Sequence, residues 1–534
     1  MDTQRRDSRR TLKFILAMIA YWLALPAFLL FVSHSIDLAL SVSLLQTGIS
    51  LPIGCILLLM GIVLSCWCAV VLYLRGGGFP LSFLPPVRLV QEGPYALSRH
   101  PLYLAFTVYL FGLGLLVRSV ASVIIIIPGF FLLWTAYAFL HEERVLARRY
   151  GDTYGEYKKN VPFFFRPRKR VPGPGIVFSI VYLLGKVIIR VLFPLDVEGE
   201  ENLPRSGPYT LLCNHASYLD PVFLVAASNR YVRFFTTGEM MRTGTGRWFF
   251  TALGSIPTSR YHVDSASVRA FLAALKAGEI VGMFPEGERT WDGNPLPINP
   301  TVERLLKRAG IPLVAAHIEG SYAVYPRWSG YPLPGRIRVR FFPPSSPDSV
   351  SDALSRVSIP VAGRTRLPRS ARGLERLIWA CPACHTIGSI TAGEHKIRCE
   401  HCHAQWSLDR SLRVRASVRA RDGTGVPLRE FVSFLTKSDI FLNTNTLASI
   451  GPVDLLVGGE ELSRVASGEV VYRDGVLHVG KRAFSLSEAR IIRLEGKNRL
   501  DLGLAQDRRL RLVFHRDSPL KWEQFLRLKL GIVT

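Results

Sequence analysis

Hydrophobic positions are concentrated before residue 195 and form runs of membrane-spanning length. Four such runs lie at 12–33, 51–74, 101–117 and 119–140. A helix needs roughly 20 apolar residues to cross a hydrocarbon layer. Arg118 alone separates the last two runs, so we expect them to form a helical hairpin. The pattern predicts a four-span α-helical transmembrane bundle within residues 1–170.

Charged residues beside these runs predict their orientation. Arginines stand before the first run, and basic residues are dense from Arg144 to Arg170, whereas 34–50 contains neither Lys nor Arg. Loops rich in Lys and Arg stay on the cytoplasmic side of a membrane. We therefore expect an integral protein of the inner, or cytoplasmic, membrane, with both termini and the soluble domains in the cytoplasm.

A further apolar run, 176–193, contains Lys186 and Arg190. Residues four apart lie on one face of a helix, so these two cations form a polar stripe. A polar stripe on an apolar helix is typical of a helix that lies in the membrane interface. We interpret 171–194 as an interfacial helix, or a shallow re-entrant one, rather than a fifth span.

The pattern changes after residue 195. Short β-branched runs such as 209–212, 280–284 and 312–318 alternate with helical periods up to about residue 347. Strands that alternate with helices predict an α/β layer over 195–347. The next stretch, 348–375, is rich in Ser, Pro and Arg and is predicted to be a linker.

Residues 411–534 are predicted to be β-rich. Turn sequences lie at 474–475 (Asp-Gly) and 497–498 (Lys-Asn). Ser518 and Pro519 have the residue types of a helix N-cap and first helical position, so we expect a terminal helix after them. This order of elements resembles a pleckstrin-homology-like or GRAM-like barrel with a C-terminal helix.

The charge balance suggests what the protein binds. The chain carries 66 Lys and Arg against 41 Asp and Glu, a net charge of +25. Such a charge suits either nucleic acid or an anionic surface. Beside apolar spans, the anionic lipids of the cytoplasmic leaflet are the simpler partner. We expect membrane lipids as partners and no nucleic acid.

Half of the eight cysteines form two CxxC pairs with 14 residues between them: Cys381 and Cys384, then Cys399 and Cys402. This spacing is typical of a zinc ribbon, in which four thiolates complete a tetrahedron around a structural ion. Four histidines nearby are alternative ligands: His385, His395, His401 and His403. A redox dithiol is the rival interpretation. We predict a zinc ribbon over 376–410, with a structural or partner-binding role.

Asn214, His215 and Asp220 form an N-H-x4-D pattern after the first long strand of the α/β region. Acyl transfer to an alcohol needs a base for the hydroxyl proton and a carboxylate that holds the imidazole in the correct tautomer. On an unbroken helix, residues five apart point about 140° from each other. We therefore predict a strand–turn–helix corner, capped by Asn214 or Ser217. Taken alone, an H-x4-D spacing is more often a helix cap than a catalytic pair.

Several patches together resemble the glycerolipid acyltransferase family, specifically its lysophosphatidic-acid acyltransferase group. They are N-H-x4-D at 214–220, G-S-I-P-T-S-R at 254–260, F-P-E-G-E-R-T at 284–290 and I-P-L-V at 311–314. The resemblance implies that His215 and Asp220 are catalytic and that Arg260 contacts the phosphate of the acceptor.

The chemistry of a phosphate-bearing acceptor extends this set. A phosphate monoester suits arginine forks and backbone amides at a glycine turn. The candidate substrate-binding residues are Asn214, Arg260, Glu286, Gly287 and Arg289. Glu286 cannot pair with phosphate, so we expect an acceptor hydroxyl or an arginine as its partner. Ser259 and Glu288 depart from the family pattern, which has an aspartate and a small hydroxyl residue there, and they leave the acceptor's identity open.

Residues 93–103, G-P-Y-A-L-S-R-H-P-L-Y, resemble the RHPxY signature of the isoprenylcysteine carboxyl methyltransferase and phospholipid methyltransferase families. The resemblance covers about 50–167 and implies S-adenosylmethionine as a cofactor. Its candidate ligands flank two spans: Arg99, His100, Tyr103, Glu142 and Glu143. Carboxylates there can hold the amino group of the cofactor, and Arg99 its carboxylate. Charges that merely flank membrane spans are the alternative interpretation.

The sequence thus predicts a multidomain membrane enzyme of phospholipid biosynthesis. It is expected to transfer a fatty acyl group from acyl-CoA or acyl-carrier protein to the hydroxyl of a lysophospholipid that resembles 1-acylglycerol-3-phosphate. The methyltransferase-like unit is a second expected activity. The alternative is a lipid-binding or scaffolding membrane protein whose catalytic domains are remnants.

Overall fold

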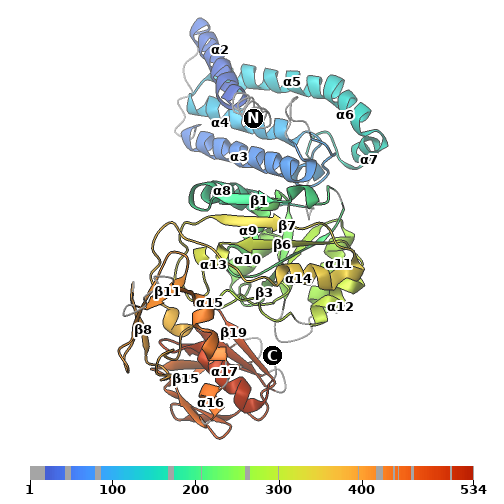
Figure 1. Cartoon of the computed structure of the whole chain (residues 1–534). Coiled ribbons are helices and arrows are strands. Elements are labelled where there is room, and N and C mark those ends of the chain that lie inside the picture. The colour runs from blue at the N-terminus through green and yellow to red at the C-terminus, as the bar shows by residue number, and fades with distance from the viewer. Residues whose placement is uncertain are drawn as a thin grey trace. The chain divides into compact units, whose positions relative to one another are not determined.

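Figure 1 shows the computed structural model of the chain. It describes residues 19–41, 50–78, 86–165, 173–205, 207–258, 265–298, 300–394, 396–416, 425–436, 439–442, 444–458, 462–504 and 508–532. The chain forms two compact units, Met1–Leu184 with Phe249–Gly254, and Gly185–Trp248 with Ser255–Thr534.

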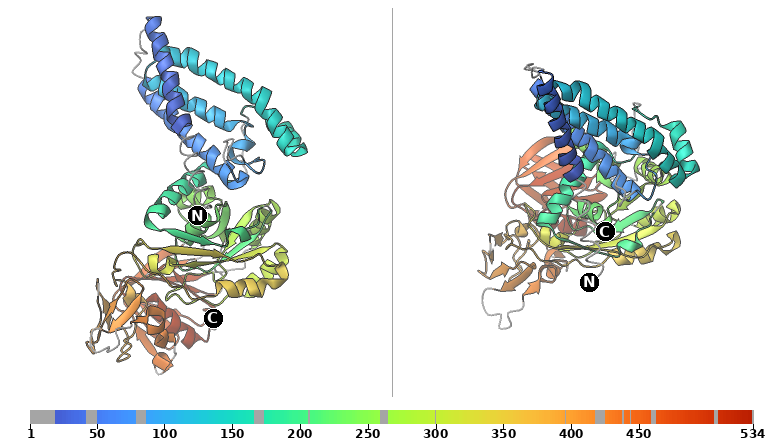
Figure 2. Two further views of the ribbon diagram at one scale, coloured as in Figure 1. Left: turned by 45° about the horizontal axis from the view of Figure 1, so that its top comes forward. Right: turned by 90° about the horizontal axis from the view of Figure 1, so that it is seen from above.

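The first unit is helical, as predicted. Its helices are α2 (Leu25–Ala39), α3 (Ser50–Val71), α4 (Pro101–Leu116), α5 (Ile127–Tyr137), α6 (Glu143–Tyr150) and α7 (Asp152–Asn160). Short π-helical turns extend α2 and α3 and join α5 to α6, so that α5 and α6 form one long helix in both views of Figure 2.

Within the described residues, three helices are long and apolar enough to cross a membrane: Ala20–Ala39, Ser50–Gly76 and Ser122–Tyr150. The sequence predicted four spans, and the difference is α4. This helix has 16 residues, which is a length of about 24 Å at about 1.5 Å per residue, less than the roughly 30 Å of a hydrocarbon core. Pro101 begins α4, and Arg118, in a left-handed conformation with φ of 58°, follows its end.

Two glycines let α3 and α4 lie side by side at close range (Figure 1). A Cβ atom at Gly61 would collide with the backbone of Tyr109, and one at Gly112 with the backbone of Leu58. Small residues permit this close approach of helices in membranes, where dispersion contacts drive association.

A helix also occupies the segment interpreted as interfacial. It is α8 (Ile176–Leu192), and its polar stripe differs from the prediction. The Lys186 ammonium donates to Asn229 Oδ1 at 2.6 Å and to the carbonyl of Ala226 at 3.1 Å, so this cation faces the protein. The exposed residues are Arg190, which is the other cation of the predicted stripe, and apolar side chains that include Leu184, Val187, Ile188 and Val191.

A seven-stranded sheet confirms the predicted α/β layer. Its order is β1 (Leu195–Glu198), β7 (Ile337–Phe341), β6 (Leu313–Glu319), β2 (Thr210–Cys213), β5 (Ile280–Met283), β3 (Val232–Thr237) and β4 (Ile256–Thr258). All neighbouring strands are parallel except β6 and β7, which are antiparallel. The short helices α10 (Gly244–Ala252) and α13 (Ser321–Val324) lie in the connections.

Helices cover both faces of this sheet. Because successive side chains of a strand point in opposite directions, each strand contributes residues to the core on each face. Leu211 and Cys213 lie in the core with α9 (Asp220–Ser228). Leu212 lies in the opposite core with α11 (Ser265–Lys276), α12 (Pro300–Ala309) and α14 (Val350–Val357). Figure 1 shows the last three helices gathered together.

The prediction that 348–375 is a linker is wrong for residues 350–357. Residues 350–357 form α14, whose buried side chains belong to the core of the sheet: Val350, Ala353, Leu354 and Val357. The spacing of these four residues is the apolar stripe of an amphipathic helix. Ser and Arg occupy the exposed face and gave the segment its linker-like composition.

The ribbon region is an antiparallel sheet of five strands. Its order is β12 (Val426–Pro427), β11 (Arg413–Ala416), β10 (Gln405–Leu408), β9 (Lys396–Cys399) and β8 (Ile390–Ala392). The predicted boundary at residue 410 falls inside this sheet, because β11 pairs with β10.

The C-terminal domain is β-rich, as predicted. One sheet has the order β13 (Thr446–Ala448), β16 (Val470–Arg473), β17 (Val476–Val479) and β18 (Arg482–Ser485). The other has the order β15 (Leu462–Gly468), β14 (Val453–Gly458), β21 (Arg509–Phe514), β20 (Arg499–Gly503) and β19 (Ile491–Glu495). Both expected turns are present, between β16 and β17 and between β19 and β20.

The terminal helix α17 (Pro519–Leu530) begins as predicted, with Pro519 in its first turn. The Ser518 hydroxyl accepts a hydrogen bond from the backbone N–H of Lys521 and is the N-cap. One buried cluster continues from Trp291 and Trp328 of the α/β region through the ribbon to Trp522 of this helix.

Candidate active sites

The acyltransferase-like motif lies where β2 ends and α9 begins. His215 Nδ1 is 2.9 Å from Asp220 Oδ2, which confirms that a turn brings the two side chains together. The same carboxylate oxygen accepts hydrogen bonds from the backbone N–H groups of Ala216 and Ser217, each at 2.8 Å. The N-cap of α9 is Leu219, so the predicted capping by Asn214 or Ser217 is wrong. Asp220 instead holds the turn itself.

This arrangement suits a general base. Asp220 is fully buried, whereas the His215 side chain is 17% exposed. A carboxylate on Nδ1 fixes the tautomer in which Nε2 can accept a proton, and it stabilises the imidazolium that results. The ring of Phe284 stacks on the imidazole, with 4.1 Å between centroids, and sets its plane.

Glu286 braces the same turn from β5. Its Oε1 accepts from the backbone N–H of His215 at 3.0 Å, and its Oε2 accepts from that of Leu296 at 3.2 Å. The sequence led us to expect an acceptor hydroxyl or an arginine as its partner, and the structure gives backbone amides instead. Glu286 therefore holds the backbone of His215 in place. Gly287, which follows, has φ of 72°, and the space beside its Cα is open.

Burial raises the pKa of Glu286 to about 7. The native state then binds a proton more tightly than the unfolded state, so this group contributes stability below about pH 4.5 that is lost as the pH rises towards 7. We expect Glu286→Gln to become more stable relative to the unsubstituted protein over that range, by at most about 3 kcal/mol. Thermal unfolding against pH measures this. The exposed Glu201→Gln is the control, and parallel profiles for all three proteins would contradict the expectation.

Arg289 is the one predicted phosphate-binding arginine that the structure describes, because Arg260 lies outside the described residues. Arg289 is 7% exposed, and its Cζ atom lies 3.3 Å from the centroid of the Tyr218 ring. Tyr218, whose ring stacks on this guanidinium, is 45% exposed. A cation held on an aromatic face is fixed in orientation.

Asn214 does not point to a substrate. Its side-chain Nδ2 donates to the carbonyl of Ile318 at 3.1 Å, and its Oδ1 accepts from the backbone N–H of Ile318 at 2.8 Å. The residue is 2% exposed. Its predicted role in substrate binding is therefore replaced by a structural one, in which it joins the ends of β2 and β6. Burial also raises the pKa of the Cys213 thiol well above its usual range, so this neighbour is no nucleophile.

Sequence reasoning missed three residues of this site: Tyr218, Phe284 and Arg327. Tyr218 and Phe284 stand inside the quoted motifs, and an aromatic ring beside a catalytic histidine or arginine is a usable signal. Arg327 belongs to no motif, and only the folded chain brings it to Glu288 and to the carbonyl of Arg289, at 3.2 and 2.9 Å.

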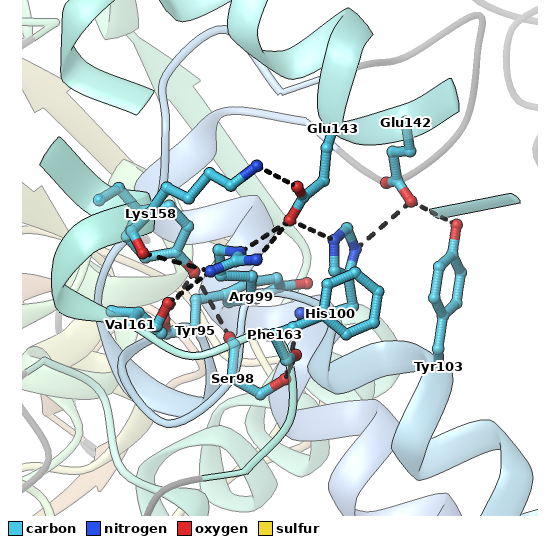
Figure 3. A network of polar contacts seen from close by, with 11 residues as sticks. Tyr95, Ser98, Arg99, His100, Tyr103, Glu142, Glu143, Lys158, Val161 and Phe163 are labelled. Atoms are coloured by element: carbon cyan, nitrogen blue, oxygen red, sulfur yellow. Dashed lines mark hydrogen bonds and ion pairs between the residues drawn. The ribbon is translucent and has the colours of Figure 1, made fainter. Parts of the chain in front are cut away.

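The methyltransferase-like residues gather in the first unit (Figure 3). Tyr103 donates to Glu142 Oε2 at 2.5 Å, and His100 Nδ1 lies 3.4 Å from the same oxygen. Glu143 is held by Arg99, at 2.6 and 2.8 Å, and by Lys158 at 2.7 Å. All five predicted residues thus form one network at the start of α4 and the junction of α5 with α6.

The network has two parts: the Arg99–Glu143 pair, whose polar groups are bonded within the protein, and Glu142 with His100, which have fewer partners. Arg99 binds Glu143 and the carbonyls of Lys158 and Val161, so the predicted role of Arg99 as the anchor of a cofactor carboxylate does not fit its contacts. Glu142 has a side chain that is 34% exposed. His100 Nε2 is buried, makes no hydrogen bond to the described residues, and lies 3.8 Å from Glu143 Oε1 (Figure 3). Glu142 and His100 therefore fit the amino-acid end of S-adenosylmethionine.

The ribbon cysteines form one cluster. The Sγ atoms of Cys381, Cys384, Cys399 and Cys402 all lie within 4.8 Å of one another. Two of these separations, Cys381–Cys402 and Cys384–Cys399, are 3.7 Å. Thiolates bound at about 2.3 Å around a tetrahedral Zn²⁺ lie about 3.8 Å apart. The spacing therefore fits zinc, and no histidine among the described residues joins the cluster.

Comparison with known proteins agrees with both motif regions. Residues 194–319 match the acyltransferase family, and residues 49–153 match the phospholipid methyltransferase family. The chain therefore holds an acyltransferase-family domain and a phospholipid methyltransferase-family domain.

Individual relatives match only part of the chain. The 1-acyl-sn-glycerol-3-phosphate acyltransferase of Bacillus subtilis is 28% identical over 136 residues, which are 25% of this chain and 67% of that protein. The chloroplastic 1-acyl-sn-glycerol-3-phosphate acyltransferase BAT2 of Brassica napus is 28% identical over 153 residues, 28% of this chain and 44% of that protein. The chain thus spans from about half to two thirds of the length of these relatives.

A further likeness is to a solved structure. The crystal structure of the 1-acyl-sn-glycerophosphate (LPA) acyltransferase PlsC from Thermotoga maritima is 21% identical, with a TM-score of 0.31, and the match covers 43% of this chain and 90% of that one.

Proposed function

We propose that this protein transfers a fatty acyl group from an acyl thioester, acyl-CoA or acyl-carrier protein, to the free hydroxyl of a lysophospholipid. The observation that carries the proposal is the 2.9 Å contact between His215 and Asp220, inside a domain that matches the acyltransferase family. The ordered contacts around it do not favour the alternative of a scaffold with remnant catalytic domains.

The chemistry follows from this geometry. His215 Nε2 takes the proton of the acceptor hydroxyl while the hydroxyl oxygen attacks the thioester carbonyl. The C–S bond of the tetrahedral intermediate then breaks, and the thiolate leaves with the proton that the imidazolium returns. The products are an ester and a free thiol. Asp220 keeps Nδ1 protonated, and Glu286 holds the backbone of His215 in place.

Arg289 is the proposed ligand of the acceptor phosphate, beside the open space at Gly287, and Arg260 is the second. Because a doubly charged phosphate monoester gains more from arginine than a diester does, we expect 1-acylglycerol-3-phosphate to be the preferred acceptor. The test is transfer of a labelled acyl chain from acyl-CoA to this acceptor by the full chain in membranes. A lysophosphatidylcholine acceptor is the comparison, and the absence of a labelled diacyl product with either acceptor would refute the proposed activity.

The second proposal is that the first unit binds S-adenosylmethionine, which when bound supplies an electrophilic methyl group. Glu142 would hold the ammonium of the cofactor, and His100 would donate to or accept from its polar end. Tyr103 orients Glu142, while Arg99 and Lys158 hold Glu143 in the wall of the site. We also propose that the soluble domains face the cytoplasm, as the positive loops predict.

Binding of the cofactor gives a test that does not depend on knowing the methyl acceptor. We expect Glu142→Gln to weaken S-adenosylmethionine binding at least about tenfold, since a charge-assisted contact is worth about 1.5–3 kcal/mol. Titration calorimetry on the purified full chain measures this. Glu156→Gln, at an exposed position of α7, is the control, and equal affinities for the two variants would remove Glu142 from the site.

A further inference from the structure

Arg327 is a buried arginine outside every sequence motif. The residue is 4% exposed and follows α13. On one side, its Nη1 group donates to the carbonyl of Arg289 at 2.9 Å and pairs with Glu288 at 3.2 Å. These two partners lie in the loop that also contains Glu286 and Gly287. One face of this guanidinium is therefore fixed to the acyltransferase-like site.

The other nitrogen atoms of the same guanidinium donate hydrogen bonds to the C-terminal domain. Nε of Arg327 donates to the carbonyl of Gly496 at 2.7 Å, and Nη2 donates to that of Leu494 at 3.1 Å. Both carbonyls belong to the end of β19 and its turn towards β20. The ring of Trp291, with Arg327 Cζ at 4.7 Å from its centroid, supports the guanidinium. A single side chain thus connects the active-site loop to a turn of the last domain.

A second contact joins the two domains at the end of the neighbouring strand β3. Glu239 Oε1 accepts from Arg511 Nη1 at 2.6 Å and from Arg499 Nη1 at 3.1 Å. Arg511 is itself held by both oxygens of Asp501 at 2.7 Å, and these carboxylates raise the pKa of its guanidinium. Glu239 in turn has a lowered pKa, since it bonds to Arg511. The segment after α13, through Arg327, and the loop after β3, through Glu239, therefore both contact the region of strands β19 to β21.

The β19–β20 turn also lies near the ring that stacks on the predicted phosphate ligand. A Cβ atom at Gly496 would lie 4.0 Å from the hydroxyl of Tyr218, whose ring stacks on Arg289. Gly496 has φ of 62°, so glycine suits this turn for its backbone conformation as well. The β19–β20 turn therefore lies beside both Tyr218 and the loop that contains Arg289.

Glu288 supports the same conclusion from the sequence. It departs from the acyltransferase pattern, which has a small hydroxyl residue at this position, and the structure shows the carboxylate pairing with Arg327. A buried guanidinium needs a carboxylate and carbonyl acceptors to offset its desolvation. Glu288 therefore supplies the negative charge that pairs with Arg327, and the carbonyls of the C-terminal domain bind the same guanidinium.

We propose that the C-terminal β-rich domain contributes to the acyltransferase site. Arg327 is the positioning residue: it connects the β19–β20 turn to Arg289 and so holds Arg289 in place to bind the acceptor phosphate. The catalytic part of this inference rests on the proposed acyltransferase activity. Because Arg327 donates to the backbone carbonyl of Arg289, it acts through Arg289, and its loss should weaken acceptor binding in particular.

The test compares Arg327→Gln and Arg327→Lys in the full chain, with Arg508→Gln as a matched control. Arg508 lies in the C-terminal domain, is exposed and pairs with Glu488 at 3.2 Å. We expect the KM for 1-acylglycerol-3-phosphate to rise at least about tenfold in Arg327→Gln and less in Arg327→Lys, as a charge-assisted hydrogen bond is lost. The KM for acyl-CoA should stay within about twofold. An unchanged acceptor KM, or equal changes in both KM values, would overturn the proposal.

Hydrogen–deuterium exchange separates this proposal from the proposed activity. We expect the amides of 286–291 and of 491–499 to exchange faster in Arg327→Gln than in Arg508→Gln, because both segments lose a shared anchor. Unchanged exchange in either segment would overturn the coupling even in an active enzyme. Lack of acyl transfer by the unsubstituted chain would refute the proposed activity, and with it the catalytic part, while the exchange result still decides whether Arg327 joins the two domains.

Discussion

His215→Ala is expected to lower the rate of acyl transfer by about 10²–10⁴-fold, the range that a positioned general base contributes. In the proposed reaction the imidazole takes the hydroxyl proton, and its Nδ1 lies 2.9 Å from Asp220 Oδ2. The neighbouring Cys213 cannot replace it, because burial keeps this thiol protonated. The measurement is kcat for transfer of a labelled acyl group by the full chain in membranes.

His478→Ala provides the control, since His478 is exposed on β17 of the C-terminal domain. The KM values should change little in His215→Ala, because the base acts mainly in the transition state. Activity of His215→Ala equal to that of the control would refute the role of this histidine. Asp220→Asn is expected to fall between the two, as the amide can keep the backbone contacts but favours the wrong tautomer.

Local sequence was sufficient to predict the strand–turn–helix corner that brings His215 to Asp220. The strand 209–212 ends in a turn and Pro221 suits the first turn of a helix, so the meeting of His215 with Asp220 followed from chain geometry. The partners of Glu286 did not follow. They are backbone amides at positions 215 and 296, and a side-chain pattern contains no information on which backbone donors a fold leaves near a carboxylate.

The contacts that join the C-terminal domain to the site lay further from what a sequence can predict. Arg327 and Leu494 are 167 positions apart, and Glu239 and Arg511 are 272 apart. No periodicity or spacing rule links residues at such distances. Composition misled in a different way at 350–357, where four polar residues alternate with the four residues of the apolar stripe, so that the composition predicts a linker where α14 forms.

In the first unit, the motif predicted which residues meet but not how they pair. Arg99 and Glu143 were each assigned to the cofactor, and the fold binds them to each other at 2.6 Å. The side chains of Arg99 and Glu143 are both largely buried. We therefore propose that this ion pair lines the cofactor site and does not itself bind the cofactor. Of the three other predicted residues, Tyr103 bonds to Glu142. Glu142 and His100 are left as the proposed cofactor contacts, and mutation can address each of them separately.

The second large effect is expected at the ribbon. Metal binding to four thiolates contributes about 10–16 kcal/mol in small zinc domains, so Cys399→Ala, or removal of the ion by a chelator, should unfold the ribbon. Cys381 and Cys399 are buried in the same cluster as Trp379, Phe441 and Trp522. Loss of the ion should therefore lower the thermal stability of the C-terminal domain as well, rather than of the ribbon alone.

Metal analysis of the purified full chain should find one zinc ion per chain, and thermal unfolding with and without chelator should show a fall of several degrees or more in Tm. Cys55→Ser, which changes an exposed cysteine of α3, is the control and should retain both the ion and the Tm. Thiols that oxidise reversibly without bound zinc would instead identify a redox dithiol. Because the β19–β20 turn contacts the active-site loop through Arg327, chelation should also raise the KM for the acceptor, which links the ion to the acyltransferase site through the C-terminal domain.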